Sequence, residues 1–194
     1  MSNKRLNVER TAEALRTADR VLMIGCSGSG KSTLAQALSR LFVLPYVSMD
    51  RDVFWMSGWI PRPRADALAI VERAVEQPRW IMDGTSPGTL PLRLPRTDLV
   101  IWMRPPRHVS LYGVISRWVR LRGKTRPEMA ANCPERLTLE FLSYVWNFEK
   151  TESPEIEQKL ADYGSDVPVF IVRSHGETRR LLKHVAHHAS SSRA

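Results

Sequence analysis

The chain has 194 residues and a formal net charge of +9 at neutral pH, from 29 Lys and Arg against 20 Asp and Glu. A hydrophobic fraction of 43% and a charged fraction of 25% are typical of a globular protein and exclude a disordered or fibrous chain. No apolar run approaches the roughly 20 residues that cross a bilayer, and the N-terminus lacks a signal-peptide core. We therefore expect a cytoplasmic protein with no membrane partner, and free thiols at Cys26 and Cys133.

The first expected elements surround a glycine-rich loop. Residues 7–18 have apolar side chains at helical spacing, 21–25 read as a buried strand, and 30–42 read as a second helix. Between strand and helix, residues 25–32 read GCSGSGKS, which fits the pattern Gly, any four residues, Gly, Lys, Ser. Strand, loop and helix follow in the order that a phosphate-binding loop requires; the alternative is an ordinary Gly/Ser turn.

This loop predicts a nucleotide site for ATP. Its glycines let backbone N–H groups approach an anion, and the positive end of the following helix points to the same place. Lys31 would reach the β- and γ-phosphates as a catalytic cation, and the Ser32 hydroxyl would hold Mg²⁺. The residues expected to bind the cofactor here are Gly25, Ser27, Gly28, Ser29, Gly30, Lys31, Ser32 and Thr33.

Carboxylates end the next two expected strands. The strand at 45–49 leads to Asp50, and the strand at 80–82 leads to Asp83. Because ligands bind at the carboxyl ends of parallel strands, both side chains are candidates for the site. Asp83 would organise Mg²⁺ together with Ser32, with a turn cap as the alternative. Asp50 would meet the acceptor, and its alternative is also a cap.

The segment at 51–64 is expected to be irregular. Asp52 lies beside Asp50, so either carboxylate is open as the functional one. Trp55 is a candidate for stacking on a substrate ring, although packing in the core is the alternative for both Trp55 and Trp59.

A helix at 64–77 and a Pro/Gly-rich loop at 85–96 flank the strand that ends at Asp83. Arg93 lies in this loop. Its fork-shaped cation suits a phosphate or carboxylate on an acceptor, and the alternative is a solvated surface charge.

The most basic stretch follows a strand expected at 99–103. Pro105 and Pro106 open a helix to about residue 121, and residues 122–134 are rich in turns. An arginine-bearing segment that closes over nucleotide would stabilise the transferring phosphoryl group and exclude water. This pattern therefore predicts a lid at about residues 117–134, and the alternative is a solvated basic helix end. The catalytic candidates in the lid are Arg117, Arg120, Arg122 and Arg126.

The remaining elements continue the alternation of strands and helices. They are helices at about 134–149, 154–162 and 176–187, a strand at 167–172, and a frayed tail at 188–194. This alternation predicts a three-layer α/β fold in one domain over residues 1–194, with a central parallel sheet between helices.

The chain resembles small bacterial adenylate-kinase-like proteins that are often labelled DNA topology modulation proteins. The resemblance covers roughly residues 20–165 and is carried by the glycine loop, WIMDG, RLPRTDLVIW and RGKTRPEMAANCPERLTLEFLSYVWNF. More broadly it extends to nucleoside monophosphate kinases, which have a P-loop core, a segment that binds the nucleoside monophosphate, and a lid; the lid of this chain would be short and helical. It implies ATP and Mg²⁺ at the glycine loop, Asp83 near the metal, Arg93 near the acceptor phosphate and Arg173 near the adenine. Residues 1–19 form an extension outside it.

The favoured function is an ATP-dependent phosphotransferase that moves the γ-phosphate to a nucleotide, a nucleoside or another small acceptor. The charge of +9 keeps a nucleic-acid-associated NTPase or regulator as the alternative, although no nucleic-acid-binding motif is present. A nucleotide-binding protein without turnover is a third reading. The sequence leaves the acceptor and the oligomeric state open.

Overall fold

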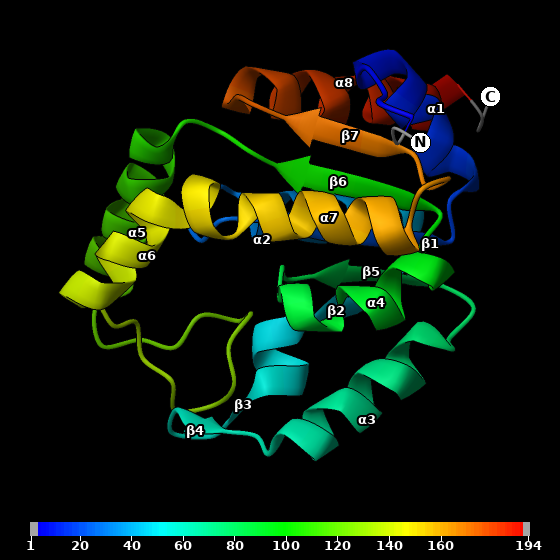
Figure 1. The fold of residues 1–194 in the computed structure, drawn as a ribbon. Coiled ribbons are helices and arrows are strands. Elements are labelled where there is room, and N and C mark those ends of the chain that lie inside the picture. The colour runs from blue at the N-terminus through cyan, green and yellow to red at the C-terminus, as the bar shows by residue number, and fades with distance from the viewer. Residues whose placement is uncertain (1–3, 192–194) are drawn as a thin grey trace.

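The computed structural model describes residues 4–191 of the chain. A central sheet of parallel strands lies between helices on both of its faces (Figure 1), which confirms the expected three-layer α/β fold. Within the described residues, no helix is both long and apolar enough to cross a membrane. In spatial order the strands are β2 (Tyr46–Ser48), β5 (Trp80–Asp83), β1 (Arg20–Gly25), β6 (Leu99–Met103) and β7 (Val169–Val172).

Alternate residues of the strands enter two separate cores, because neighbouring side chains of a strand point to opposite faces. Val21 and Met23 of β1 pack on one face, beneath α1 (Val8–Thr17), α2 (Lys31–Phe42) and α8 (His175–Ser191). Leu22 and Ile24 pack on the other face with residues from five helices. Those helices are α3 (Arg64–Val75), α4 (Leu90–Arg93), α5 (Arg107–Arg120), α6 (Leu139–Thr151) and α7 (Ser153–Tyr163).

The parallel register brings the strand ends to one edge of the sheet. Met23 of β1 lies opposite Asp83 of β5, and Gly25 lies opposite Met103 of β6. The glycine loop, Asp83 and Arg104 therefore all lie at the carboxyl edge, where α/β sheets bind ligands.

Two segments expected to be irregular or loop-like contain short elements. Residues 51–61 lie within a π-helical turn, η1 (Met49–Phe54), and a hairpin of β3 (Trp55–Met56) and β4 (Ile60–Pro61). The loop at 85–96 holds η2 (Pro87–Thr89), α4 and η3 (Leu94–Arg96).

The helix expected from residue 134 begins five residues later. Thr138 is its N-cap, because the Thr138 hydroxyl accepts a hydrogen bond from the Phe141 N–H at 3.2 Å. The lid segment therefore consists of the last turn of α5 and a loop that runs to Thr138.

The N-terminal extension is part of the fold over its described residues. Its helix α1 lies beside α8 (Figure 1). Before that helix, the Leu6 N–H donates to the Val169 carbonyl at 3.0 Å, and the Val169 N–H donates to the Lys4 carbonyl at 3.0 Å. Arg5 thus forms a single parallel bridge with Val169, alongside the first residue of β7. Residues 1–3, and residues 192–194 of the tail expected to fray, lie outside the described residues.

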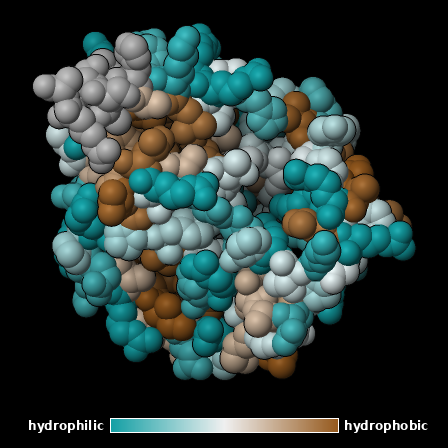
Figure 2. All heavy atoms as spheres, turned by 180° about the vertical axis from the view of Figure 1, so that it is seen from behind, coloured by the Kyte–Doolittle hydropathy of each residue, from teal (hydrophilic) through white to brown (hydrophobic). Residues whose placement is uncertain are grey.

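The surface of the molecule is largely hydrophilic. Seen from behind, hydrophobic residues gather in separate patches between hydrophilic ones (Figure 2). Single exposed apolar side chains such as Tyr112 and Val119 are normal on a globular protein.

Candidate active site

The glycine loop joins β1 to α2 at the carboxyl edge of the sheet. Gly30 precedes α2 with a φ of 91°, a left-handed conformation that favours glycine. The Leu34 N–H donates to the Gly30 carbonyl at 3.1 Å, so the N–H groups of Lys31, Ser32 and Thr33 come before the helical ladder. Such free N–H groups at a helix start form an anion-binding end.

Gly28 has a second structural reason to be glycine. A Cβ on Gly28 would overlap the Ser110 carbonyl of α5, and a Cβ on Gly113 of α5 would overlap the Gly28 carbonyl. Helix α5 therefore packs directly on the loop, and both glycines permit the close approach. The helix that carries the first lid arginines is held against the predicted phosphate site.

A cavity of about 370 Å³ lies in front of the loop and is lined from both sides by cations. Lys31 comes from the loop, Arg117 and Arg120 come from α5, and Arg126 comes from the lid. Tyr112 also lines it. The predicted site residues that line this cavity are Gly28, Gly30, Lys31, Ser32, Thr33, Arg117, Arg120 and Arg126.

The other predicted loop residues lie behind this cavity. Gly25 exchanges hydrogen bonds with the Thr85 hydroxyl, which ties the loop to the segment after β5. Ser29 is buried, and its hydroxyl has no hydrogen-bond partner among the described residues. Ser27 is half-buried.

Arg122 differs from the other lid arginines. It is exposed, it does not line the cavity, and its guanidinium lies over the Trp118 ring at 5.5 Å. The structure therefore does not bring Arg122 to the loop with Arg117, Arg120 and Arg126.

Glu135 positions two of the lid arginines. One carboxylate oxygen lies 3.1 Å from Nε of Arg117, and the other lies 3.0 Å from Nε of Arg126. The Arg126 contact is an ion pair, because its Nε makes no hydrogen bond among the described residues. Burial lowers the pKa of Arg117, as does the charge of Arg126, and Glu135 opposes both effects. The nearly buried carboxylate, with 7% of its side chain exposed, holds both cations at the cavity.

Polar contacts tie the segment predicted as a lid to the carboxyl edge of the sheet. The Ser48 hydroxyl donates to the Glu128 carbonyl at 2.8 Å, and Gln36 of α2 donates to the Glu128 carboxylate. The Gly58 N–H of the β3–β4 turn donates to the Ala131 carbonyl at 3.1 Å.

Apolar side chains of the same segment also pack against the β3–β4 hairpin. Trp55 meets Trp59 edge-on at 5.1 Å, and both pack on a small cluster that includes Met129 and Cys133. The Trp59 N–H donates to the Cys133 sulfur at 3.1 Å, and its indole N–H donates to the Pro134 carbonyl at 3.1 Å. Of the two expectations for Trp55, the structure shows packing, here against the lid.

Asp83 is a buried carboxylate, 4% exposed, at the end of β5. The Tyr46 hydroxyl donates to Oδ2 of Asp83 at 2.8 Å, and burial followed by the Asp83 charge raises the pKa of Tyr46. Oδ1 of Asp83 has no hydrogen-bond partner among the described residues. A buried carboxylate oxygen without a donor suits a cation such as Mg²⁺. Nowhere in the described part of the chain do three His, Cys, Asp or Glu side chains gather to hold a metal.

Asp50 and Asp52 have different partners. Asp52 accepts a hydrogen bond from the Ser48 N–H at 2.8 Å and pairs with Arg51 at 2.7 Å, so it caps the η1 turn. Asp50 has 44% of its side chain exposed and lies 3.3 Å from Arg126 of the lid. Of the two carboxylates left open by the sequence, Asp50 is the one that faces the lid.

Arg93, expected to meet an acceptor, is buried and bound to backbone carbonyls. It is 0% exposed, and its guanidinium donates to the carbonyls of Gly84, Thr85 and Ser86, at 2.6 Å for Gly84. Burial lowers the pKa of Arg93 to about 9, which leaves it charged at neutral pH. It braces the loop after Asp83 from inside the protein.

Arg173 also lies elsewhere than expected. It is absent from the loop cavity, where His175, the first residue of α8, is found instead. Arg173 lines a second cavity beside the start of α5. Its side chain follows Ile171 on the sheet face that α7 covers, because strand residues two apart share a face.

Both cysteines are free, as expected, and both are buried. Burial raises the pKa of Cys26 to about 12, and the charge of Lys31 opposes this shift. The Cys26 thiol in the glycine loop is therefore neutral at physiological pH.

Sequence reasoning missed Glu135, Glu128, Tyr46 and His175. Glu128 and Glu135 are carboxylates inside an otherwise basic segment, and this contrast was the available signal. Tyr46 and His175 carry no local pattern, because their place at the site depends on which strand ends are neighbours.

Comparisons with known proteins support the fold. No protein-family model and no curated protein matches the chain. Shikimate kinase from Acinetobacter baumannii, solved in complex with shikimate, has a similar structure, with a TM-score of 0.60 and 15% identity over 93% of this chain and 98% of that chain. Shikimate kinase from Bacteroides thetaiotaomicron has a TM-score of 0.51 and 14% identity over 90% and 99%. A gluconokinase from Sinorhizobium meliloti 1021 has a TM-score of 0.45 and 17% identity over 91% and 97%. The chain thus shares the fold of P-loop kinases.

Proposed function

We propose that this protein is an ATP-dependent phosphotransferase that moves the γ-phosphate of ATP to a hydroxyl group of a small acceptor. The observation that carries the proposal is the cavity lined by Lys31 of the loop and by Arg117, Arg120 and Arg126. Phosphoryl transfer spreads negative charge over three oxygens, and its catalysis consists mostly of positioning and charge stabilisation. The fold shared with two shikimate kinases, one of them in complex with shikimate, agrees with a small acceptor.

The loop would bind the donor. The N–H groups of Lys31, Ser32 and Thr33 suit the phosphates, and the Lys31 ammonium suits the β- and γ-phosphates. Tyr112 and His175 extend the same cavity beyond the loop and would flank the nucleoside part.

The residues around Asp83 fit Mg²⁺. Its Oδ1 lacks a donor, its Oδ2 is held by Tyr46, and Ser32, in the first turn of α2, lines the loop cavity. Bound Mg²⁺ would neutralise phosphate charge, and phosphate oxygens and water would complete its ligands.

The lid arginines would stabilise the transferring phosphoryl group. Glu135 holds Arg117 and Arg126 in place before the reaction, so little reorganisation is needed when charge develops. The closed loop, packed on Trp55 and Trp59, would keep water away from the phosphate.

Asp50 would serve the acceptor. In the reaction the acceptor oxygen forms a bond to the γ-phosphorus as the bond to the leaving ADP oxygen breaks, and the acceptor proton passes to the Asp50 carboxylate. Asp50 is in contact with Arg126 of the lid, so an acceptor bound at Asp50 would also lie beside a lid arginine. The acceptor class is a nucleotide, a nucleoside or another small hydroxyl compound.

The experiment is a panel of nucleosides, nucleotides, sugars and hydroxy acids with ATP labelled at the γ-phosphate. We expect label to move to one acceptor class, and to require Mg²⁺. Label that passes only to water, with every acceptor present, would contradict a kinase. Label release that occurs only when DNA or RNA is added would favour the nucleic-acid-associated NTPase.

A further inference from the structure

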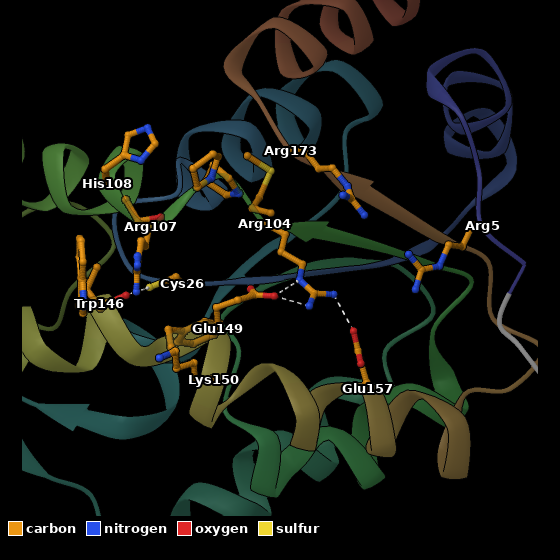
Figure 3. Close-up of a pocket in the computed structure, with 16 residues that line it drawn as sticks. Arg5, Cys26, Arg104, Arg107, His108, Trp146, Glu149, Lys150, Glu157 and Arg173 are labelled. Atoms are coloured by element: carbon orange, nitrogen blue, oxygen red, sulfur yellow. Dashed lines mark hydrogen bonds and ion pairs between the residues drawn. The ribbon is translucent and has the colours of Figure 1, made fainter.

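A second and larger cavity, of about 840 Å³, lies beside the start of α5 (Figure 3). It is bounded by the start of α5, by α6 and α7, and by the ends of β6 and β7. It shares no lining residue with the loop cavity. Its volume is in the range of sites that bind small molecules, about 300–1,000 Å³.

The charges that line this cavity are unbalanced. Five cations, Arg5, Arg104, Arg107, Lys150 and Arg173, face two carboxylates, Glu149 and Glu157, for a net charge of +3 with His108 neutral. Both carboxylates are engaged by Arg104, with the Glu157 contact at 2.6 Å. Within residues 4–186, no carboxylate pairs with the other four cations.

Sheet register places three of the arginines together. The Arg104 N–H donates to the Val172 carbonyl at 2.7 Å, so Arg104 lies beside Arg173 at the strand ends. Arg5 reaches the same face from its bridge with Val169. Figure 3 shows the guanidinium groups of Arg5, Arg104 and Arg173 turned toward one open space. Because like charges repel, an anion between Arg5 and Arg173 would remove an unfavourable interaction and gain charge-assisted hydrogen bonds.

The opposite end of the cavity is apolar. It is lined by Val145, Phe148 and the thiol of Cys26, all of them buried. Beside them, Arg107 stacks on the Trp146 ring at 4.0 Å. The cavity thus offers fork-shaped cations at one end and an apolar wall at the other.

We propose that this cavity is a second anion-binding site, which takes a small polyvalent phosphate compound with its phosphate between Arg5 and Arg173. Paired guanidinium forks match phosphate oxygens in geometry, and a net charge of +3 favours a polyvalent anion over a single carboxylate. The site also gives the N-terminal segment a role, because the bridge between Arg5 and Val169 of β7 places Arg5 at this cavity.

The test is calorimetric titration with inorganic pyrophosphate in a Lys31→Ala background, which removes the lysine of the loop cavity. We expect this variant to bind one pyrophosphate per chain. Adding Arg5→Ala and Arg173→Ala should weaken that binding on the order of 100-fold, the loss expected for two charged hydrogen-bonding partners. Because Arg5 and Arg173 do not line the loop cavity, the change in affinity does not depend on whether the protein is a kinase.

A matched control is Arg16→Ala with Arg179→Ala in the same background, which removes two exposed arginines outside both cavities. It should leave the affinity within threefold. Arg173→Gln alone should weaken binding about tenfold and serves if the double variant does not fold. The proposal is overturned if the Lys31→Ala protein binds no pyrophosphate, if removal of Arg5 and Arg173 leaves its affinity unchanged, or if the control lowers it equally.

Discussion

The carboxylate of Glu135 lies 3.0 Å from Nε of Arg126, and both side chains are nearly buried, at 7% and 13% exposure. The same carboxylate also holds Arg117 of α5 at 3.1 Å. One acidic residue therefore fixes the spacing between an arginine on a helix and an arginine on the lid loop. Both arginines line the cavity in front of the glycine loop.

Replacing Glu135 with Gln should lower kcat by about 10- to 100-fold, because misplaced arginines stabilise the transferring phosphoryl group less well. The KM for ATP should change little, since the loop still binds the donor. Steady-state kinetics with varied ATP separates the two effects. Glu140→Gln, at an exposed position of α6, is the matched control and should behave as wild type. A rise in KM at constant kcat would contradict a positioning role.

The lid arginines should differ in importance according to where they point. Arg126→Ala is expected to lower kcat on the order of 10²–10³-fold, as for other preorganised charges at a transition state. Arg122→Ala should cost less than about fivefold, because Arg122 is exposed and stacks on Trp118 outside the cavity. Both variants are compared by kcat at saturating ATP. Equal losses would show that the lid adopts a different arrangement during turnover.

Asp83→Asn should raise the Mg²⁺ concentration for half-maximal activity by at least about tenfold, because the unpaired Oδ1 is lost as an anionic ligand. Tyr46→Phe should have a smaller effect in the same direction, since it frees Oδ2 without removing the charge. Calorimetry of ATP binding with and without Mg²⁺ gives a readout independent of turnover. Asp66→Asn, on the exposed start of α3, is the control. Unchanged Mg²⁺ dependence in Asp83→Asn would remove Asp83 from the metal site.

Arg93→Lys should lower the free energy of unfolding by about 3 kcal/mol, because the shorter Lys side chain lacks the planar fork with which the guanidinium reaches three carbonyls. Urea unfolding measures this loss, and Arg96→Lys at an exposed position nearby is the control. If Arg93 instead bound an acceptor, the variant would keep its stability and show only a raised KM for the acceptor.

The local parts of this structure were predictable from the sequence. Glycine spacing and apolar periodicity located β1, the loop and α2, since each depends on neighbouring residues only. The alternation of strands and helices was enough to predict the parallel sheet.

The features that could not be predicted from the sequence depend on contacts between residues far apart in the chain. Arg93 lies between Leu90 and Leu94, a pattern that signals burial only once 85–96 is known to contain a short helix. The cavity that Arg173 enters depends on which face of β7 meets α7, and sequence periodicity does not say so. The pairing of Glu135 with Arg117 joins residues on opposite ends of the lid loop.

The most direct test of the central claim is transfer of γ-labelled phosphate from ATP to the acceptor by wild type, Lys31→Ala and Lys124→Ala. Lys31 lines the loop cavity, whereas Lys124 is an exposed lid residue outside it. The account predicts that Lys31→Ala lowers kcat/KM on the order of 10²–10³-fold or more and that Lys124→Ala stays near wild type. Undiminished transfer in Lys31→Ala would contradict phosphoryl transfer at the glycine loop.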